Sequence, residues 1–152
     1  MKTKAILITL FWSMVPVIEL RGAIPRGIVA GLDFKTALIV AIIGNLIPVP
    51  ILVLFTTKVF AWLRTKSEWL NRLVTKLEEK GRSKQGSVEK YKFWGLMLLV
   101  AIPLPGTGAW TGCLVAALME MKLKDAFPAI ALGVVLAGLI VTAVTYGVVV
   151  AF

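Results

Sequence analysis

The chain has 152 residues, 59% of them hydrophobic, and a mean hydropathy of +0.89, which excludes an ordinary soluble domain. Its net charge of +9 in so apolar a chain points to anionic lipid headgroups rather than to nucleic acid. There is no histidine and a single cysteine, Cys113, so neither a metal site, a cofactor nor an internal disulfide is expected.

The first apolar stretch covers residues 5–32 and is interrupted by charges and proline. Lys2 and Lys4 ahead of it fit the start of a signal peptide. However, Glu19-Leu-Arg-Gly follows instead of a small-residue cleavage site, so we expect the segment to be retained. Each half is too short to cross ~30 Å of hydrocarbon at ~1.5 Å per residue, which predicts a re-entrant hairpin.

Two stretches are long enough to be conventional transmembrane helices. Residues 36–55 contain no charge, and residues 126–152 are equally uninterrupted by charges. The first of them carries Asn45 close to Pro48 and Pro50. Asn45 is expected either to line a path between hairpins or to make a hydrogen bond between helices, and the sequence leaves both open.

Residues 56–92 form a basic linker between the two halves. Thr65 and Glu68 have the spacing of a capping box, and apolar residues follow at helical spacing as far as Gly81, read as a helix stop. We expect a basic amphipathic helix on the cytoplasmic membrane surface, with packing on its own domain or a dimer partner as the alternative. Residues 81–86 are expected to form a mobile loop.

The third apolar stretch, residues 93–119, is broken near its middle. Pro103 and Pro105 remove two backbone donors, and several glycines permit backbone angles that a helix interior does not use: Gly106, Gly108 and Gly112. A break near 103–108 leaves two short helices, which predicts a second re-entrant hairpin.

The two halves correspond weakly but in order, through residues 87 or 89 positions apart: Val15-Pro16 with Ile102-Pro103, and Ala37 and Gly44 with Ala126 and Gly133. We therefore predict an all-α integral membrane fold built as an inverted repeat of hairpin plus transmembrane helix. The chain would be a single membrane domain over 1–152, with repeat 1 at 1–55 and repeat 2 at 93–152.

Positive charges predict the orientation of the linker. With two hairpins, 12 Lys and Arg lie on the linker side of the membrane and 3 lie on the other. Four full spans would give the same two numbers. Because positively charged loops stay in the cytoplasm, the linker is expected there, in a multi-pass protein of a prokaryotic inner membrane. The charge count does not choose between hairpins and full spans.

Glu19 is the one acidic residue well inside an apolar stretch, and such groups are functional by default. It is a candidate for proton coupling. The alternative is an ion pair with Arg21 or Arg26 that locks the hairpin. These two arginines match the geometry of phosphate or carboxylate, although Arg26 is equally suited to reach the membrane interface.

The run 103–112 carries no charge but offers backbone amides, two hydroxyls and an indole at the start of a half-helix. Such a tip can hold an anion, whereas the alternative is that its glycines serve close packing. The candidate binding residues here are Pro103, Pro105, Gly106, Thr107, Gly108, Trp110 and Thr111.

Three motifs, 19–28, Gly44-Asn45 with Pro48, and 103–112, together resemble the small multidrug export protein family over nearly the whole chain. That family is similar to a minimal form of the DedA superfamily. The resemblance implies two re-entrant hairpins, each followed by a spanning helix, and a relationship to undecaprenyl phosphate translocases and lipid scramblases. Glu19 matches the acidic residue of the first DedA hairpin, which is implicated in proton-dependent function. DedA proteins carry arginines in the second hairpin, however, and this chain carries them in the first.

We expect a proton-motive-force-dependent membrane transporter that moves an amphiphilic or anionic substrate, such as a lipid-linked phosphate, between the two hairpin tips. The expected partners are membrane lipids, among them anionic lipids or polyprenyl phosphate, together with protons and a second copy in a homodimer. Two alternatives stay open: export of cationic drugs bound by Glu19, and a non-transporting module that assembles partners through the linker. An enzyme is not expected, because no nucleophile–base pair is present.

Overall fold

A computed structural model describes residues 1–104 and 107–152 of the chain, with side chains described outside 87–91. These residues form helices and turns without a strand, which confirms the all-α prediction. The helices are α1 (Lys2–Met14), α2 (Glu19–Val29), α3 (Phe34–Leu46), α4 (Val49–Arg64), α5 (Glu68–Tyr91), α6 (Phe93–Ala101), α7 (Ala109–Leu118) and α8 (Leu123–Ala151).

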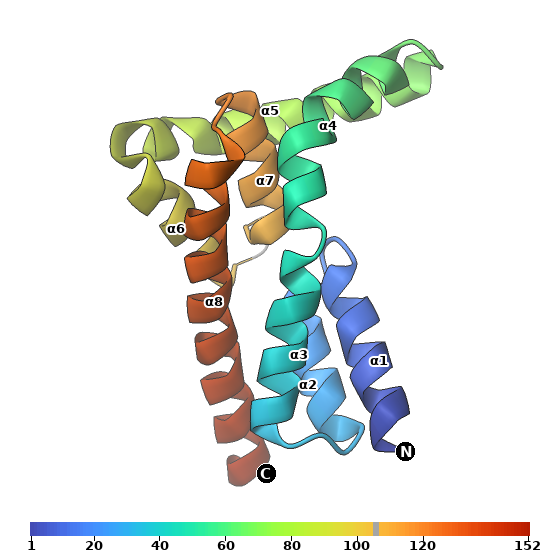
Figure 1. Ribbon diagram of the computed structural model, residues 1–152, viewed down its shortest axis with the longest axis vertical. Coiled ribbons are helices and arrows are strands. Elements are labelled where there is room, and N and C mark those ends of the chain that lie inside the picture. Colours follow the sequence, from blue (N-terminus) through green and yellow to red (C-terminus); the bar gives the residue numbers. More distant parts are fainter. Residues whose placement is uncertain (105–106) are drawn as a thin grey trace.

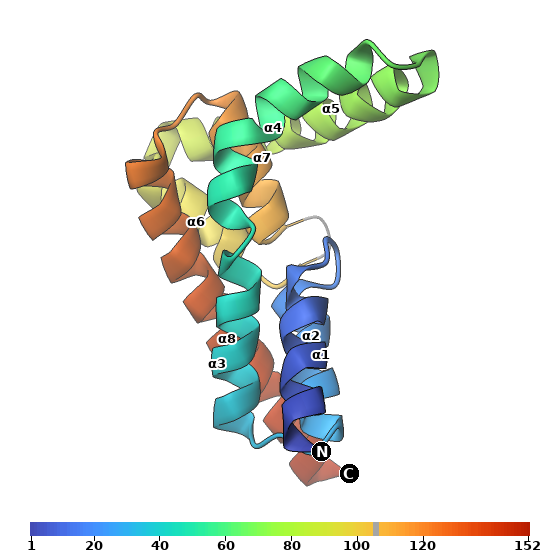
Figure 2. The ribbon, with the colours of Figure 1, turned by 45° about the vertical axis from the view of Figure 1, so that its right-hand side comes forward.

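The short helices are arranged as two pairs at opposite ends of the molecule (Figures 1 and 2). The first pair, α1 and α2, lies antiparallel at the end that holds both chain termini. The second pair, α6 and α7, lies at the other end, where α5 crosses. The connection between α1 and α2 meets the end of α6 and the start of α7 near mid-height.

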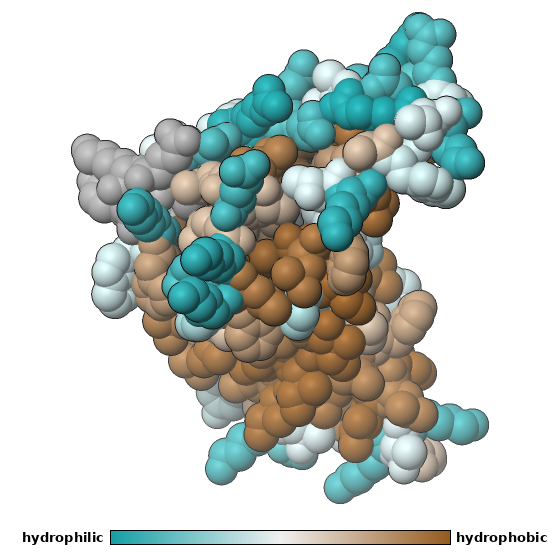
Figure 3. Space-filling view, turned by 45° about the horizontal axis from the view of Figure 1, so that its top comes forward, coloured by the Kyte–Doolittle hydropathy of each residue, from teal (hydrophilic) through white to brown (hydrophobic). Residues whose placement is uncertain are grey.

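Two elements run the full height and are long and apolar enough to cross a membrane: Phe34–Arg64, which comprises α3 and α4, and Leu123–Ala151. Only 28% and 33% of the most apolar stretch of each element is buried, whereas a core helix in a soluble protein is mostly buried. Figure 3 shows the corresponding apolar surface between polar ends. The two lie where transmembrane helices were predicted, but their limits differ.

The prediction that the first span ends at residue 55 is wrong, since α4 continues to Arg64. The sequence predicts that the polar linker begins at Thr56. Its hydroxyl instead donates to the backbone carbonyl of Leu52 one turn earlier, so the helix accommodates this polar residue. Around 47–48 the helix is interrupted, because Pro48 has no N–H to donate.

Asp33 begins the first long element by capping α3. Its carboxylate accepts hydrogen bonds from the Thr36 hydroxyl at 2.7 Å and from the Thr36 backbone N–H at 3.0 Å. Both bonds favour the ionised form and lower the pKa of Asp33. This cap sets the point at which the chain turns from α2 into α3.

Two glycines allow backbones to touch. A Cβ at Gly44 of α3 would lie 2.6 Å from the Leu10 carbonyl oxygen of α1, and one at Gly133 of α8 would lie 2.7 Å from the Met97 carbonyl oxygen of α6. Each long element is therefore held against the first helix of a pair at a position where only glycine fits.

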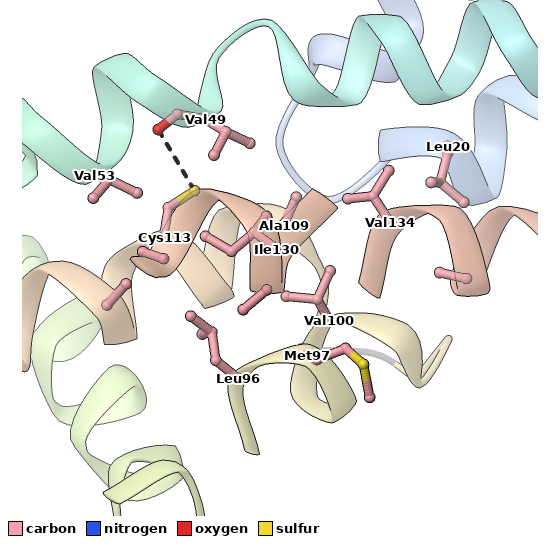
Figure 4. Close-up of a cluster of buried hydrophobic side chains, with 14 of the residues drawn as sticks. Leu20, Val49, Val53, Leu96, Met97, Val100, Ala109, Cys113, Ile130 and Val134 are labelled. Atoms are coloured by element: carbon pink, nitrogen blue, oxygen red, sulfur yellow. Dashed lines mark hydrogen bonds between the residues drawn. The ribbon is translucent and has the colours of Figure 1, made fainter. Parts of the chain in front are cut away.

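The main hydrophobic core lies where the second helix pair meets α4 and α8 (Figure 4). Ile130 of α8, Leu96 and Val100 of α6 and Val49 of α4 are fully or almost fully buried there. The lone cysteine, Cys113 of α7, is buried in the same cluster, with its sulfur 4.0 Å from the Val49 carbonyl oxygen. This core fixes α7, whose first turn takes part in the site described below.

The linker differs from its prediction in two ways. Ser67 rather than Thr65 caps α5, since its hydroxyl oxygen accepts the Leu70 N–H at 3.1 Å, while the Thr65 hydroxyl donates to the Trp62 carbonyl. Gly81 does not stop the helix, and the predicted loop at 81–86 is helical. Gly81 is buried where α5 passes close to α7, and a larger side chain would not fit there.

Arg64 ties α5 to the end of α4. Its guanidinium contacts Glu78 at 2.5 Å, Asn71 at 2.8 Å and Thr75 at 3.2 Å, all on one face of α5. The second described ion pair, between Arg72 and Glu68, is highly exposed and lies within α5. Arg64 therefore supplies polar contacts that hold the end of α4 and the first half of α5 together, and these two segments are called the arm below.

We expect Gly133→Ala to lower the free energy of unfolding by about 1–3 kcal/mol, because the new methyl group would meet the Met97 carbonyl. Thermal unfolding in detergent measures the loss. Gly147→Ala in the same helix is the matched control, since nothing lies within 4 Å of that position. Equal stabilities of the two variants would contradict the close approach.

We expect Arg64→Ala to raise the rate of limited proteolysis within 65–80 about tenfold, the effect of ~1.4 kcal/mol less local stability. The matched control is Arg72→Ala, which removes the exposed pair and should leave the rate near that of the wild type. A wild-type cleavage rate in Arg64→Ala would show that other contacts hold α5 in place.

Candidate functional site

The turn between α1 and α2 adopts an unusual backbone. Val17 and Glu19 have φ angles of 75° and 48°, in the left-handed region that non-glycine residues rarely occupy. Such conformations cost about 1–3 kcal/mol each and persist where surrounding contacts impose them. At Glu19 such a contact comes from Trp110 of the second helix pair.

Glu19, at the start of α2, is 4% exposed and faces the start of α7. Its Oε1 accepts the Trp110 backbone N–H at 3.1 Å. The first amides of a helix have no partner within the helix and carry partial positive charge, so a carboxylate there is stabilised. Glu19 of the first pair thus caps a helix of the second.

Arg21, half-buried and two residues further along α2, binds the other side of the same connection. Its guanidinium donates to the carbonyl oxygens of Leu104 at 2.5 Å and Ile102 at 3.2 Å, and to the Thr107 hydroxyl at 2.8 Å. The two carbonyls belong to the residues just after α6 ends. Both carbonyls also lie within hydrogen-bond distance of the Thr107 hydroxyl, so Arg21 adds a charged donor to this turn and ties it to α2.

Trp110 of the second pair in turn binds the end of a helix of the first pair. Its indole Nε1 donates at 3.2 Å to the carbonyl of Met14, the last residue of α1. Each helix pair therefore provides hydrogen-bond partners for a helix end of the other. The chemistry available here is a carboxylate and a guanidinium held side by side by backbone groups.

Gly108 allows this contact. It has a φ of 113°, and a Cβ there would lie 2.3 Å from Glu19 Oε2 and 3.0 Å from Arg21 Nη2. Both its backbone angle and the close approach of two side chains require glycine. Gly108 thus packs against both charged groups.

A cavity of about 820 Å³ begins at this contact and extends along α4 to α5. Its walls are mainly apolar, and its charged lining residues are Glu19 and Arg21 at one end and Lys80 of α5. The remaining lining residues are Pro16, Val17, Leu52, Thr56, Phe60, Leu77, Pro103, Thr107, Trp110, Thr111 and Leu114. Such a space suits a molecule with an apolar body and a polar group.

The structure brings most of the candidate residues together. Glu19, Arg21, Pro103, Thr107, Trp110 and Thr111 line the cavity, and Gly108 lies against the two charged groups. The candidates Pro105 and Gly106 lie outside the described residues.

Two candidate residues lie elsewhere. Arg26 is exposed, with its guanidinium carbon 4.5 Å from the ring centroid of Trp12. Asn45 is buried in α3 and does not line the cavity; its Oδ1 has no hydrogen-bond partner among the described residues. Neither therefore joins Glu19 and Arg21 in this structure.

The close ion pairs of the described residues are those of Arg64 and Arg72, and none of them joins Glu19 to Arg21 or Arg26. Arg21 nevertheless attracts Glu19 electrostatically, so the alternative of an ion pair that locks the hairpin stays a prediction. The described part of the chain also holds no group of three His, Cys, Asp or Glu side chains suited to a metal ion.

Sequence reasoning missed the cavity walls from α4 and α5. Leu52, Thr56 and Phe60 recur every four residues and so share one face of α4, and Leu77 and Lys80 share a face of α5. This spacing was readable in the sequence. It could not reveal that these faces turn toward the connection between the short helices.

Comparison with known proteins places the chain in a family. The family model described as "Putative small multi-drug export protein" matches residues 19–140, well over half of the chain. No curated protein and no solved structure matches it. With its two long apolar elements, the chain is a membrane protein and belongs to the small multidrug export protein family.

Proposed function

We propose that this chain is a membrane transporter of amphiphilic anions and that the cavity between the two helix pairs is its substrate site. The carrying observation is that the largely apolar cavity ends at Glu19 and Arg21, where the two pairs meet. A substrate with an apolar body, such as a lipid-linked phosphate, fits its shape and lining.

In this proposal each helix pair is a re-entrant hairpin. The four short helices have 9 to 13 residues, about 14–20 Å, which is less than the ~30 Å of hydrocarbon. Broken backbone at that depth is tolerated where protein groups satisfy it, as Glu19 and Arg21 do here. The contact between the turns is then the midplane of the transporter.

The proposed inverted repeat is supported by the two glycine contacts. Gly44 meets Leu10 and Ser13, and Gly133 meets Met97 and Val100. The two contacted residues of α1 lie 87 positions before those of α6, which is the offset seen in the sequence, and the glycines are 89 apart. Corresponding residues therefore make corresponding contacts in opposite halves of the molecule.

The charges of the lining favour an anionic substrate. The lining contains two cationic side chains, Arg21 and Lys80, and one carboxylate, Glu19. That carboxylate already accepts a hydrogen bond from the Trp110 N–H. A cationic group in the cavity would meet two like charges. The proposed orientation places the basic linker in the cytoplasm, so the wall formed by α5 belongs to that side of the membrane.

Glu19 is the proposed proton carrier. A proton on its carboxylate would remove the negative charge that faces α7 and weaken the bond from the Trp110 N–H. The two turns could then separate, so proton binding would change access to the cavity. The similarity of Glu19 to the acidic residue of the first DedA hairpin agrees with this role.

Export of lipophilic cations is the second candidate function, favoured by the family description and by a buried carboxylate in the cavity. Uptake of tetraphenylphosphonium and of a polyprenyl phosphate analogue into the same proteoliposomes separates the two. Movement of the cation without the phosphate would replace the proposal with the second function.

We expect Glu19→Gln to abolish pH-dependent uptake of the polyprenyl phosphate analogue into liposomes. Glutamine is neutral at every pH and holds the Trp110 N–H as weakly as protonated Glu19 would, so the contact between the turns no longer responds to protons. Glu79→Gln, on the exposed surface of α5, is the control and should retain wild-type coupling. Full coupling in Glu19→Gln would remove Glu19 from the mechanism.

We expect Arg21→Lys to lower stability in detergent by about 1–3 kcal/mol and to reduce uptake, because one ammonium group cannot reproduce the three guanidinium contacts. Thermal unfolding and uptake are measured on the same preparation. Arg26→Lys is the control, since its ammonium can still lie over Trp12. Wild-type stability in Arg21→Lys would mean that positive charge suffices at this position.

A further inference from the structure

We infer that Lys80 is a headgroup contact for an anionic membrane lipid that enters the cavity sideways, beneath the arm formed by α4 and α5. This inference deepens the proposed function and rests on it. It assigns the substrate's origin to the leaflet on the linker side and its first polar contact to a single lysine.

The position of Lys80 is set by the next residue. A Cβ at Gly81 would lie 2.9 Å from Leu118 Cδ1 and 3.0 Å from Leu114 Cγ, so α5 rests directly on α7 there. Leu114 also lines the cavity. Lys80 is thereby fixed at the boundary between the cavity and the exposed surface of α5.

An apolar stripe leads to this position. Trp69, Leu73 and Leu77 follow one another at intervals of four residues, and they are 69%, 39% and 39% exposed. Leu77 lines the cavity, so the stripe continues the cavity wall outward along the same face of α5. Figures 1 and 2 show this arm projecting beyond the helix bundle, where lipid would meet it.

Lys80 is the cation of the arm best placed to bind a substrate. Arg64 and Arg72 are engaged by carboxylates, whereas Lys58 and Lys66 lie over aromatic rings. Within the described side chains, no contact of the Lys80 ammonium group is present. At the inner end of the cavity, Arg21 already donates to three acceptors.

Charge and shape together select the occupant. A lysine beside an apolar stripe at the membrane surface matches a phosphate headgroup with hydrocarbon chains, and each such lysine contributes roughly 1 kcal/mol toward anionic lipid. A soluble anion would use the lysine but not Trp69 or Leu73. The exposed stripe therefore favours a lipid over free phosphate.

The test is binding of fluorescent phosphatidic acid to the purified chain in phosphatidylcholine nanodiscs. We expect Lys80→Gln to weaken binding about fivefold and Lys80→Arg to restore it. Lys76→Gln, on the same helix but outside the cavity, should bind as the wild type does. Because Lys80 is exposed, these variants leave the packed core untouched.

Wild-type binding by Lys80→Gln would overturn the inference, and so would equal losses in the Lys80 and Lys76 variants, which would indicate general surface attraction. Competition by inorganic phosphate at the lipid's own concentration would also overturn it, because the occupant would then be a soluble anion. The fivefold loss without any uptake by the wild type would support the lipid contact and refute the proposed transport function.

Discussion

The structure depends on how two interrupted helices satisfy their backbone groups in apolar surroundings. α6 ends with carbonyls that have no partner within the helix, and α7 begins with free amides. Arg21 donates to the carbonyls of Ile102 and Leu104, which follow the end of α6, and Glu19 accepts the Trp110 N–H in the first turn of α7. Two residues of opposite charge, two positions apart on α2, thus stabilise both sides of the break between α6 and α7.

This arrangement explains why charged residues occur in an otherwise apolar segment. Their charge is used structurally against the backbone, yet both groups still border the cavity. The proposed function would therefore be coupled to stability at Glu19, because a change in its charge would also change the bond between the two halves. The left-handed backbone at Glu19 adds to this, because the conformation requires the contact to be made.

Much of the fold was predictable from the sequence, and the exceptions have physical causes. Pro103 and the neighbouring glycines indicated the break between α6 and α7, and the 87-residue correspondence with Pro16 agreed with the break after α1. The end of α4 and the course of α5 were mispredicted, because Thr56 and Gly81 were read by their local preferences. In the structure the Thr56 hydroxyl binds the Leu52 carbonyl, and Gly81 packs on α7, so both residues lie within helices.

Of the candidate site, Glu19 was identified by the cost of burying a charge, which is a property of the residue and its segment. Arg26 could not be separated from Arg21 in the same way, because the sequence does not show which side of α2 faces the second helix pair. The hydrogen bond from Trp110 to Met14 was also beyond reach, since it joins residues 96 positions apart.

The exchange of partners across the two helix pairs has a consequence for how the protein is made. Ribosomes synthesise α1 and α2 about 90 residues before α6 and α7. Glu19 and Arg21, which bind the later segment, are thus synthesised before it. The carbonyl of Met14 gains its indole donor only after Trp110 has been synthesised. If the halves insert in chain order, the N-terminal half would present both charged groups before the C-terminal half needs them.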